Sequence, residues 1–317
     1  MEVALDKAEH RASGPANTSS RFSWKSRDGL TLSGCIWEPA AGTTAPKVPV
    51  LCLPGLSRNT RDFNRVADFL QKQGHRVIAL DYRGRGQSDW DADWQNYALT
   101  VEDGDIDDAI AKLGLDRFAV LGTSRGGLHA MMMAQRYEKR RLAAVILNDI
   151  GPHIEMRGVH RLAATIGRNM TFADKHAHAA LMKHNMEHQF PRLCEQDWLD
   201  WVDQLASGSD GKWKLDYDPA LGHTLATLDE GAPWPDLWPL YKGLEGIPVL
   251  IIHGQTSDLL TAESCQKMLD ELPGAKLHVV PDEGHAPLLW DRPTQSAISN
   301  FIETAEAKNQ QAATGES

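Results

Sequence analysis

The sequence predicts an α/β fold: a mostly parallel central sheet with helices on both faces and an inserted helical cap. Short apolar runs such as VPVLCL, FAVLG and LAAVILN alternate with amphipathic stretches of helical period. Strands that are apolar throughout are buried on both faces, and their alternation with helices indicates a parallel sheet. Between Pro152 and Pro239 the strand-like runs stop and the pattern becomes helical, which indicates an insertion.

Each core element has its own local signal. Two strands meet at Asp28-Gly29, a dipeptide suited to a tight hairpin, and the next strand ends at Pro54-Gly55. A helix follows and ends at Gly74, where glycine is the usual C-terminal residue. The further core elements are expected as strand 75–84, helix 101–114, strand 118–124, helix 126–137, strand 142–151, strand 247–258, helix 262–272, strand 276–285 and helix 294–305.

These elements divide the chain into four parts. We expect flexible tails at 1–20 and 308–317, because both are polar and lack periodicity. The α/β core is expected over 21–151 and 240–307, and the helical cap over 152–239.

Charge and composition restrict the function classes. The 317 residues carry a formal net charge of -10, which disfavours nucleic acid and anionic membranes as partners. No apolar run has the length of a membrane span, and the N-terminus lacks the apolar stretch of a secretory signal. We therefore expect a cytoplasmic protein that acts on a small molecule; the sequence does not indicate the oligomeric state.

Ser124 is the candidate nucleophile. It is the central residue of Gly122-Thr123-Ser124-Arg125-Gly126, between a predicted strand and a predicted helix. A strand–turn–helix junction of this kind exposes the serine hydroxyl, and small residues on either side let strand and helix approach each other. The alternative is an ordinary serine in a glycine-rich turn.

His285 and Asp258 are the predicted partners of Ser124. A serine hydroxyl needs a base, and His285 follows a late strand, at the sheet edge where Ser124 also lies. A carboxylate should orient the imidazole, and Asp258 follows the preceding strand. Asp149 is the rival acid because it also follows a strand. We favour Asp258, and the chain order is then serine, acid, histidine.

The developing oxyanion needs two donors. The backbone N–H of Arg125 directly follows the nucleophile, and the N–H of Leu56 follows the strand that ends at Pro54-Gly55. These two groups are the predicted oxyanion hole.

Several motifs together resemble the α/β-hydrolase fold superfamily, in its capped esterase and C–C hydrolase branch. They are LCLPGLSRN, ALDYRGRGQSD, GTSRGG, GQTSD and EGHAPLLWDRP, and the resemblance spans Phe22 to Ala307. It implies a serine hydrolase that needs no cofactor and no metal. Two positions depart from common patterns of the family: Pro54 stands where many relatives have His, and Thr123 stands where C–C hydrolases commonly have Asn. Ser124 itself argues against epoxide or halide chemistry, which uses an aspartate nucleophile.

The predicted reaction is hydrolysis of small to medium hydrophobic or aromatic carboxylic esters through an acyl-enzyme. Two alternatives stay open: a lactonase or C–C bond hydrolase that uses the same residues, and a small-ligand sensor with incidental turnover. The resemblance also places the cap over the crevice. The cap should favour apolar groups there, because it holds Trp198, Trp201, Trp213, Trp234, Trp238, Met156, Met170, Met182 and Met186.

The remaining motifs are interpreted as structural. Arg83 and Arg85 lie in a turn beside the site and are expected to be structural or solvated. His184 and His188 have a spacing that could hold a metal, but the third ligand is missing from the pattern. The four cysteines, Cys35, Cys52, Cys194 and Cys265, form no C-x-x-C motif and are expected to be free, buried thiols.

Overall fold

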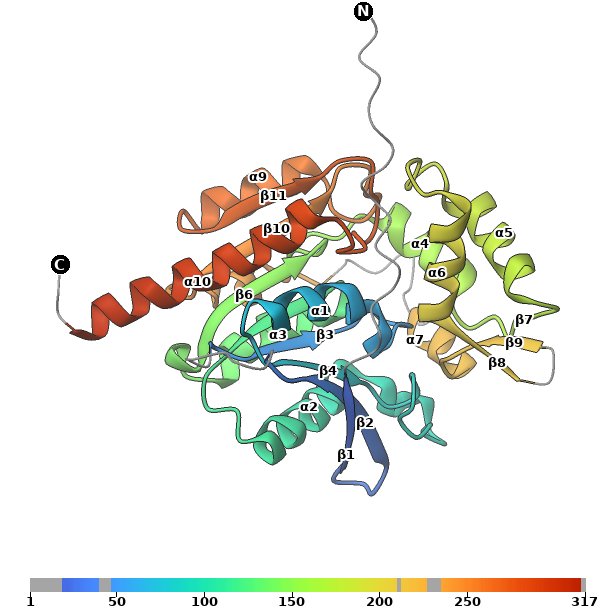
Figure 1. The fold of residues 1–317 in the computed structure, drawn as a ribbon, viewed down its shortest axis with the longest axis horizontal. Helices are drawn as coiled ribbons and strands as arrows, with labels where there is room; N and C mark the ends of the chain where they lie inside the picture. The colour runs from blue at the N-terminus through green and yellow to red at the C-terminus, as the bar shows by residue number, and fades with distance from the viewer. Residues whose placement is uncertain (1–18, 40–46, 210–211, 227–234, 315–317) are drawn as a thin grey trace, which may run out of the picture.

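The computed structural model describes residues 19–39, 47–209, 212–226 and 235–314. Its main sheet has eight strands in the order β1-β2-β4-β3-β5-β6-β10-β11 (Figure 1). The strand β2 pairs antiparallel with β1 and with β4, and every other pair is parallel. The predicted fold class is confirmed. The strands are β1 (Ser20–Lys25), β2 (Thr31–Trp37), β3 (Val50–Leu53), β4 (Val77–Asp81), β5 (Phe118–Thr123), β6 (Leu142–Asn148), β10 (Val249–Gly254) and β11 (Lys276–Val280).

Two apolar cores lie on the two faces of this sheet. Strand residues alternate between them: Leu51 of β3 belongs to one core, and its neighbours Val50 and Cys52 belong to the other. Helices α2, α3, α8 and α9 supply the first core, and α1 and α10 supply the second. Their bounds are α1 (Asn64–Lys72), α2 (Leu99–Leu113), α3 (Arg125–Arg136), α8 (Trp238–Lys242), α9 (Ala262–Glu271) and α10 (Arg292–Thr314).

The segment between β6 and β10 contains the predicted helices and also a small sheet. Three short strands pair antiparallel in the order β7-β9-β8. The sequence pattern did not predict them, because strands of two to four residues on the surface carry no continuous apolar run. The elements are α4 (Met156–Thr165), β7 (Thr171–Phe172), α5 (Lys175–Met186), α6 (Glu195–Leu205), β8 (Ala206–Ser209), β9 (Lys212–Leu215) and α7 (Gly222–Ala226).

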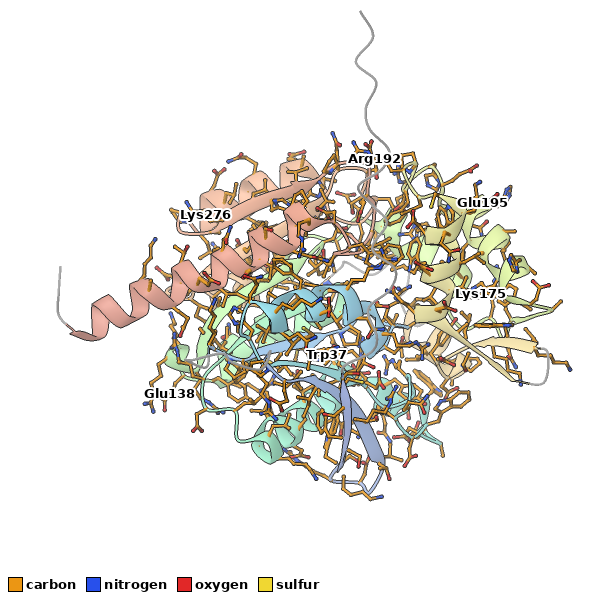
Figure 2. All side chains as sticks on the ribbon, viewed as in Figure 1. Trp37, Glu138, Lys175, Arg192, Glu195 and Lys276 are labelled. Atoms are coloured by element: carbon orange, nitrogen blue, oxygen red, sulfur yellow. The ribbon has the colours of Figure 1, made fainter. Side chains whose placement is uncertain are left out.

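This inserted layer lies at the carboxyl ends of the parallel strands. In Figure 2, Lys276, the first residue of β11, is at the end of the molecule away from the insertion. Lys175 and Glu195, the first residues of α5 and α6, are at the opposite end. The loops that follow the strands therefore face the inserted layer, as expected for a site in an open parallel sheet.

The expected segment boundaries differ in places from the structure. Helix α8 begins at Trp238 and packs against α3, so the core resumes before position 240. Helix α10 continues to Thr314, past the predicted core end at 307, so most of the stretch predicted as a C-terminal tail is helical. The predicted N-terminal tail lies outside the described residues up to position 18, and β1 already begins at Ser20.

The cysteines of the described chain form no disulfide. Cys35, Cys52 and Cys265 are buried, but Cys194 at the start of α6 is exposed, so the prediction of a buried thiol is wrong there. Burial raises the pKa of Cys265 to about 12. Among the described residues, no helix combines the length and the hydropathy that crossing a bilayer requires.

Candidate active site

Ser124 occupies a sharp turn between β5 and α3. Its backbone has φ 51° and ψ -114°, a conformation that L-residues rarely adopt. Two glycines permit this turn. A Cβ on Gly122 would lie 2.3 Å from the carbonyl oxygen of Gly126, and a Cβ on Gly126 would lie 2.0 Å from that of Leu53. The small residues expected on both sides of the serine are therefore sterically required.

Ser124 and His285 meet, although they are 161 positions apart. His285 Nε2 lies 3.0 Å from Ser124 Oγ, within hydrogen-bond range. The imidazole is buried and lies in the loop between β11 and α10. The structure therefore brings the predicted hydroxyl and base together at the edge of the sheet.

The carboxylate against His285 is Asp149, not Asp258. Asp149 Oδ2 lies 2.8 Å from His285 Nδ1, and Asp149 follows β6. The geometry thus corrects the predicted acid in favour of its rival. Both carboxylates follow strands at the same sheet edge, so position in the chain could not decide between them.

Asp149 is held as an ionised acceptor. It is fully buried and accepts bonds from the backbone N–H of Gly254 at 2.8 Å and the hydroxyl of Ser257 at 2.6 Å. Burial by itself would raise the pKa of Asp149, but contacts with His253, His285 and Ser257 outweigh it and hold the pKa below its usual value. A charged carboxylate at Nδ1 favours the tautomer whose Nε2 can accept the serine proton.

Asp258 has a different partner. It forms a two-point ion pair with Arg161 of α4, at 2.6 Å to Nε and 2.8 Å to Nη2. Burial raises the pKa of Asp258, but the contact with Arg161 outweighs this effect and holds the pKa below its usual value. This carboxylate is therefore also ionised. Because Arg161 comes from the inserted layer, the pair joins that layer to the core.

The two segments that carry the predicted oxyanion donors lie beside Ser124. The N–H of Arg125 is the first of α3, where N–H groups have no partner within the helix. The loop of Gly55 and Leu56 passes close by: a Cβ on Gly55 would lie 3.8 Å from Ser124 Cβ. Both segments border the reacting hydroxyl.

One buried carboxylate, Glu102 of α2, links these two segments. Arg85 donates from Nε to the carbonyl of Leu56 at 2.7 Å and from Nη1 to Glu102 Oε1 at 2.6 Å. Arg125 donates from Nε to Glu102 Oε2 at 2.6 Å. Burial would raise the pKa of Glu102, but Arg125 and Arg85 hold it well below its usual value. Sequence reasoning missed Glu102, since an acidic residue on an amphipathic helix looks like a surface residue.

The turn with Arg83 and Arg85 is structural, as predicted, but not solvated. Arg83 is buried and pairs at 2.7 Å with each of Asp28, Asp91 and Asp105. Arg85 is fully buried. The two side chains therefore pair with different carboxylates, although Arg85 also donates from Nη1 to the backbone carbonyl of Arg83 at 2.7 Å. Of the two side chains, that of Arg85 contacts the Leu56 loop beside Ser124.

A cavity of about 560 Å³ opens above Ser124 and His285. This is within the size range of small-molecule sites. Cap residues supply much of its wall, including the predicted Trp201, Met170, Met182 and Met186. Other predicted cap residues pack elsewhere. Trp198 and Trp213 lie in the cap's own core, and Met156 and Trp238 pack against the main core. Trp234 lies outside the described residues.

The charged side chains of the cavity wall are Arg58, Asp62, Arg161 and Arg168. Arg58 forms a two-point pair with Asp62, at 2.7 and 2.8 Å. His178 also lines the cavity, and burial together with Arg58 lowers its pKa to about 4. Within the described part of the chain, His184 and His188 join no group of three or more metal-ligating side chains.

Comparisons with known proteins identify the family of the chain. The model of the alpha/beta hydrolase fold family matches residues 48–292, so the chain belongs to that family. A 3-hydroxybutyrate-oligomer hydrolase of Cupriavidus necator is 33% identical over 263 residues, which cover 80% of this chain and 87% of that protein. A proline iminopeptidase of Lactobacillus delbrueckii subsp. lactis is 26% identical over 277 residues, covering 82% and 92%.

A solved structure is similar over most of the chain. The crystal structure of an alpha/beta hydrolase from Novosphingobium aromaticivorans superposes with a TM-score of 0.82 at 32% identity, covering 91% of this chain and 99% of that one. The protein is thus a hydrolase of the alpha/beta fold. Its named relatives cleave different bonds, so the family alone does not identify the substrate.

Proposed function

We propose that this protein hydrolyses carboxylic esters through an acyl-enzyme. The observation that carries the proposal is the chain of contacts from Ser124 through His285 to Asp149, at 3.0 and 2.8 Å. A serine hydroxyl, an imidazole and an ionised carboxylate in this order make up the machinery of acyl transfer.

In the proposed reaction, Ser124 Oγ attacks the ester carbonyl while His285 Nε2 takes its proton. The N–H groups of Leu56 and Arg125 hold the oxyanion. His285 then returns the proton to the leaving alcohol, and the acyl group stays on Ser124. Water, activated by the same imidazole, releases the acid and restores the serine. Asp149 keeps the ring oriented and balances its charge throughout.

The cavity supports substrates of small to medium size. Its walls combine aliphatic, methionine and aromatic side chains from the core loops and the cap. The similar protein from Cupriavidus necator is named for the hydrolysis of hydroxybutyrate oligomers, which are short aliphatic esters. We propose this class of ester as the first to test.

A panel of p-nitrophenyl esters of increasing acyl length tests the reaction. We expect turnover by the wild type and loss of about 10³-fold or more in kcat for Ser124→Ala. Ser23→Ala is the matched control, because Ser23 is an exposed serine of β1 outside the cavity lining. Turnover of lactones or ring-fission diketo acids in place of esters would instead support the lactonase or C–C hydrolase alternatives.

A fluorophosphonate probe identifies the nucleophile independently. We expect one covalent adduct per chain, located on the Ser124 peptide by mass spectrometry. Labelling elsewhere, or equal ester turnover by Ser124→Ala, would contradict the proposal.

A further inference from the structure

The charge on the cavity wall is unbalanced. Three arginines line the cavity, but Asp62 is the only acidic residue among its described lining residues. The carboxylate that pairs with Arg161 belongs to Asp258, which is not part of the lining. The side chain of Asp258 is 4% exposed and that of Arg161 is 21% exposed. A ligand in the cavity therefore contacts the guanidinium of Arg161 and not the carboxylate of Asp258.

Arg161 keeps donor capacity toward the cavity. Its Nε and Nη2 bind Asp258, whereas the partner of its Nη1 among the described residues is the thioether sulfur of Met186, at 3.9 Å. Arg58, in contrast, is neutralised by Asp62 on the same wall.

Arg168 is the third cation, in the loop between α4 and β7. It lines the cavity, and no carboxylate in the described part of the chain forms an ion pair with it. A guanidinium has a planar fork of donors that fits a carboxylate with two parallel hydrogen bonds. Arg168 therefore offers an anion a partner that no described carboxylate occupies.

We propose that the site takes esters that end in a free carboxylate, and that Arg168 binds this carboxylate while the ester lies at Ser124. This inference rests on the proposed ester hydrolysis and names its substrate class: short oligoesters of hydroxy acids, or half-esters of dicarboxylic acids. With a formal net charge of -10 the molecule as a whole repels anions, so binding of a carboxylate depends on the local cations of the cavity wall. Arg161 adds to the positive potential of the cavity wall.

Two matched substrates test the inference. One is the linear trimer of 3-hydroxybutyrate with its free carboxylate; the other is the same trimer with that carboxylate converted to a primary amide. Both carry the same ester bonds and differ in charge. We expect the wild type to have a KM for the acid about tenfold lower than for the amide, because charge-assisted bonds are the strong ones. The KM of the acid should rise with salt, and that of the amide should not.

The variant Arg168→Gln should raise the KM of the acid about tenfold and leave that of the amide within about twofold. The KM of the acid for Arg168→Lys should lie between those of the wild type and Arg168→Gln, since lysine keeps the charge and loses the paired donors of the guanidinium. Arg157→Gln is the matched control: Arg157 is an exposed arginine of α4 outside the cavity lining, and its removal changes the net charge equally. It should change neither KM.

The outcomes separate this inference from the proposed function. Equal KM values of acid and amide in the wild type, or an equal rise of both in Arg168→Gln, would overturn the carboxylate site while p-nitrophenyl esters are still cleaved. Absence of any Ser124-dependent ester turnover would overturn the proposed function itself. Thermal unfolding of each variant confirms that the compared proteins are folded.

Discussion

Asp149 Oδ2 lies 2.8 Å from His285 Nδ1, while Asp258 is engaged by Arg161 through two bonds of 2.6 and 2.8 Å. The two carboxylates follow different strands and are both ionised, but only one orients the imidazole. Because the two carboxylates have different partners, mutating each one separately distinguishes their contributions to catalysis.

We therefore expect Asp149→Asn to lower kcat by about 10³-fold or more, because an amide at this position favours the wrong imidazole tautomer. Asp258→Asn should lower kcat by less than about tenfold, since its carboxylate contacts Arg161 and not the ring. Steady-state kinetics on a p-nitrophenyl ester measure both, and the rate of fluorophosphonate labelling provides a second readout. A larger loss in Asp258→Asn than in Asp149→Asn would assign the acid to position 258.

The bonds of Arg85 to Leu56 and Glu102 predict an effect on the transition state. Lysine keeps the charge beside Glu102 but cannot also hold the Leu56 carbonyl, so Arg85→Lys should misplace the Leu56 N–H. We expect kcat to fall about tenfold or more with KM nearly unchanged, since an oxyanion donor acts in the transition state. Binding of a trifluoromethyl ketone should weaken by a similar factor.

Arg83→Lys is the control for this effect. Arg83 is equally buried in a cluster of three carboxylates but touches neither oxyanion segment. It should lower stability and leave kcat within about twofold. Equal losses of kcat in the two variants would show that general destabilisation, not the position of Leu56, is responsible.

The backbone of Ser124 predicts a conflict between stability and activity. Its positive φ costs an L-residue about 1–3 kcal/mol, whereas glycine adopts this region without strain. Glycine loses more backbone entropy on folding, but this cost is smaller than the strain that it removes. Ser124→Gly should therefore be more stable than Ser124→Ala by about 1 kcal/mol. Both variants lack the hydroxyl, so urea unfolding compares the backbone alone. Equal midpoints would mean that the turn stores no strain.

Glu283 predicts a pH dependence of stability. Burial raises its pKa to about 7, and its carboxylate accepts the backbone N–H of Leu288 at 2.7 Å in the loop that carries His285. Between the unfolded value near 4.5 and about 7, the folded protein binds the additional proton. Stability contributed by this group is therefore present below the unfolded pKa and is lost as the pH rises through that window.

The test compares urea unfolding of the wild type and Glu283→Gln from pH 5 to pH 8. The variant should gain stability relative to the wild type as the pH rises, by up to about 1.4 kcal/mol for each unit of pKa shift. A constant difference across this range would show that Glu283 does not titrate there.

Local sequence determined a large part of this protein. The apolar runs of β3, β5 and β6 could become strands only with both faces covered. Positions 122 and 126, on either side of Ser124, have room for glycine and for no larger residue. The hydroxyl and the imidazole were predictable because each follows a strand, and the carboxyl ends of parallel strands share one edge.

The tertiary structure alone decided which acid serves His285, and it revealed Glu102 and the pairing of Arg161. The reason is physical: these outcomes depend on side-chain directions and on contacts between residues 23 to 136 positions apart. A periodic pattern reports which face of an element is buried. It does not report which buried charge lies within 3 Å of another, because that distance is set only when the loops and the inserted layer pack together.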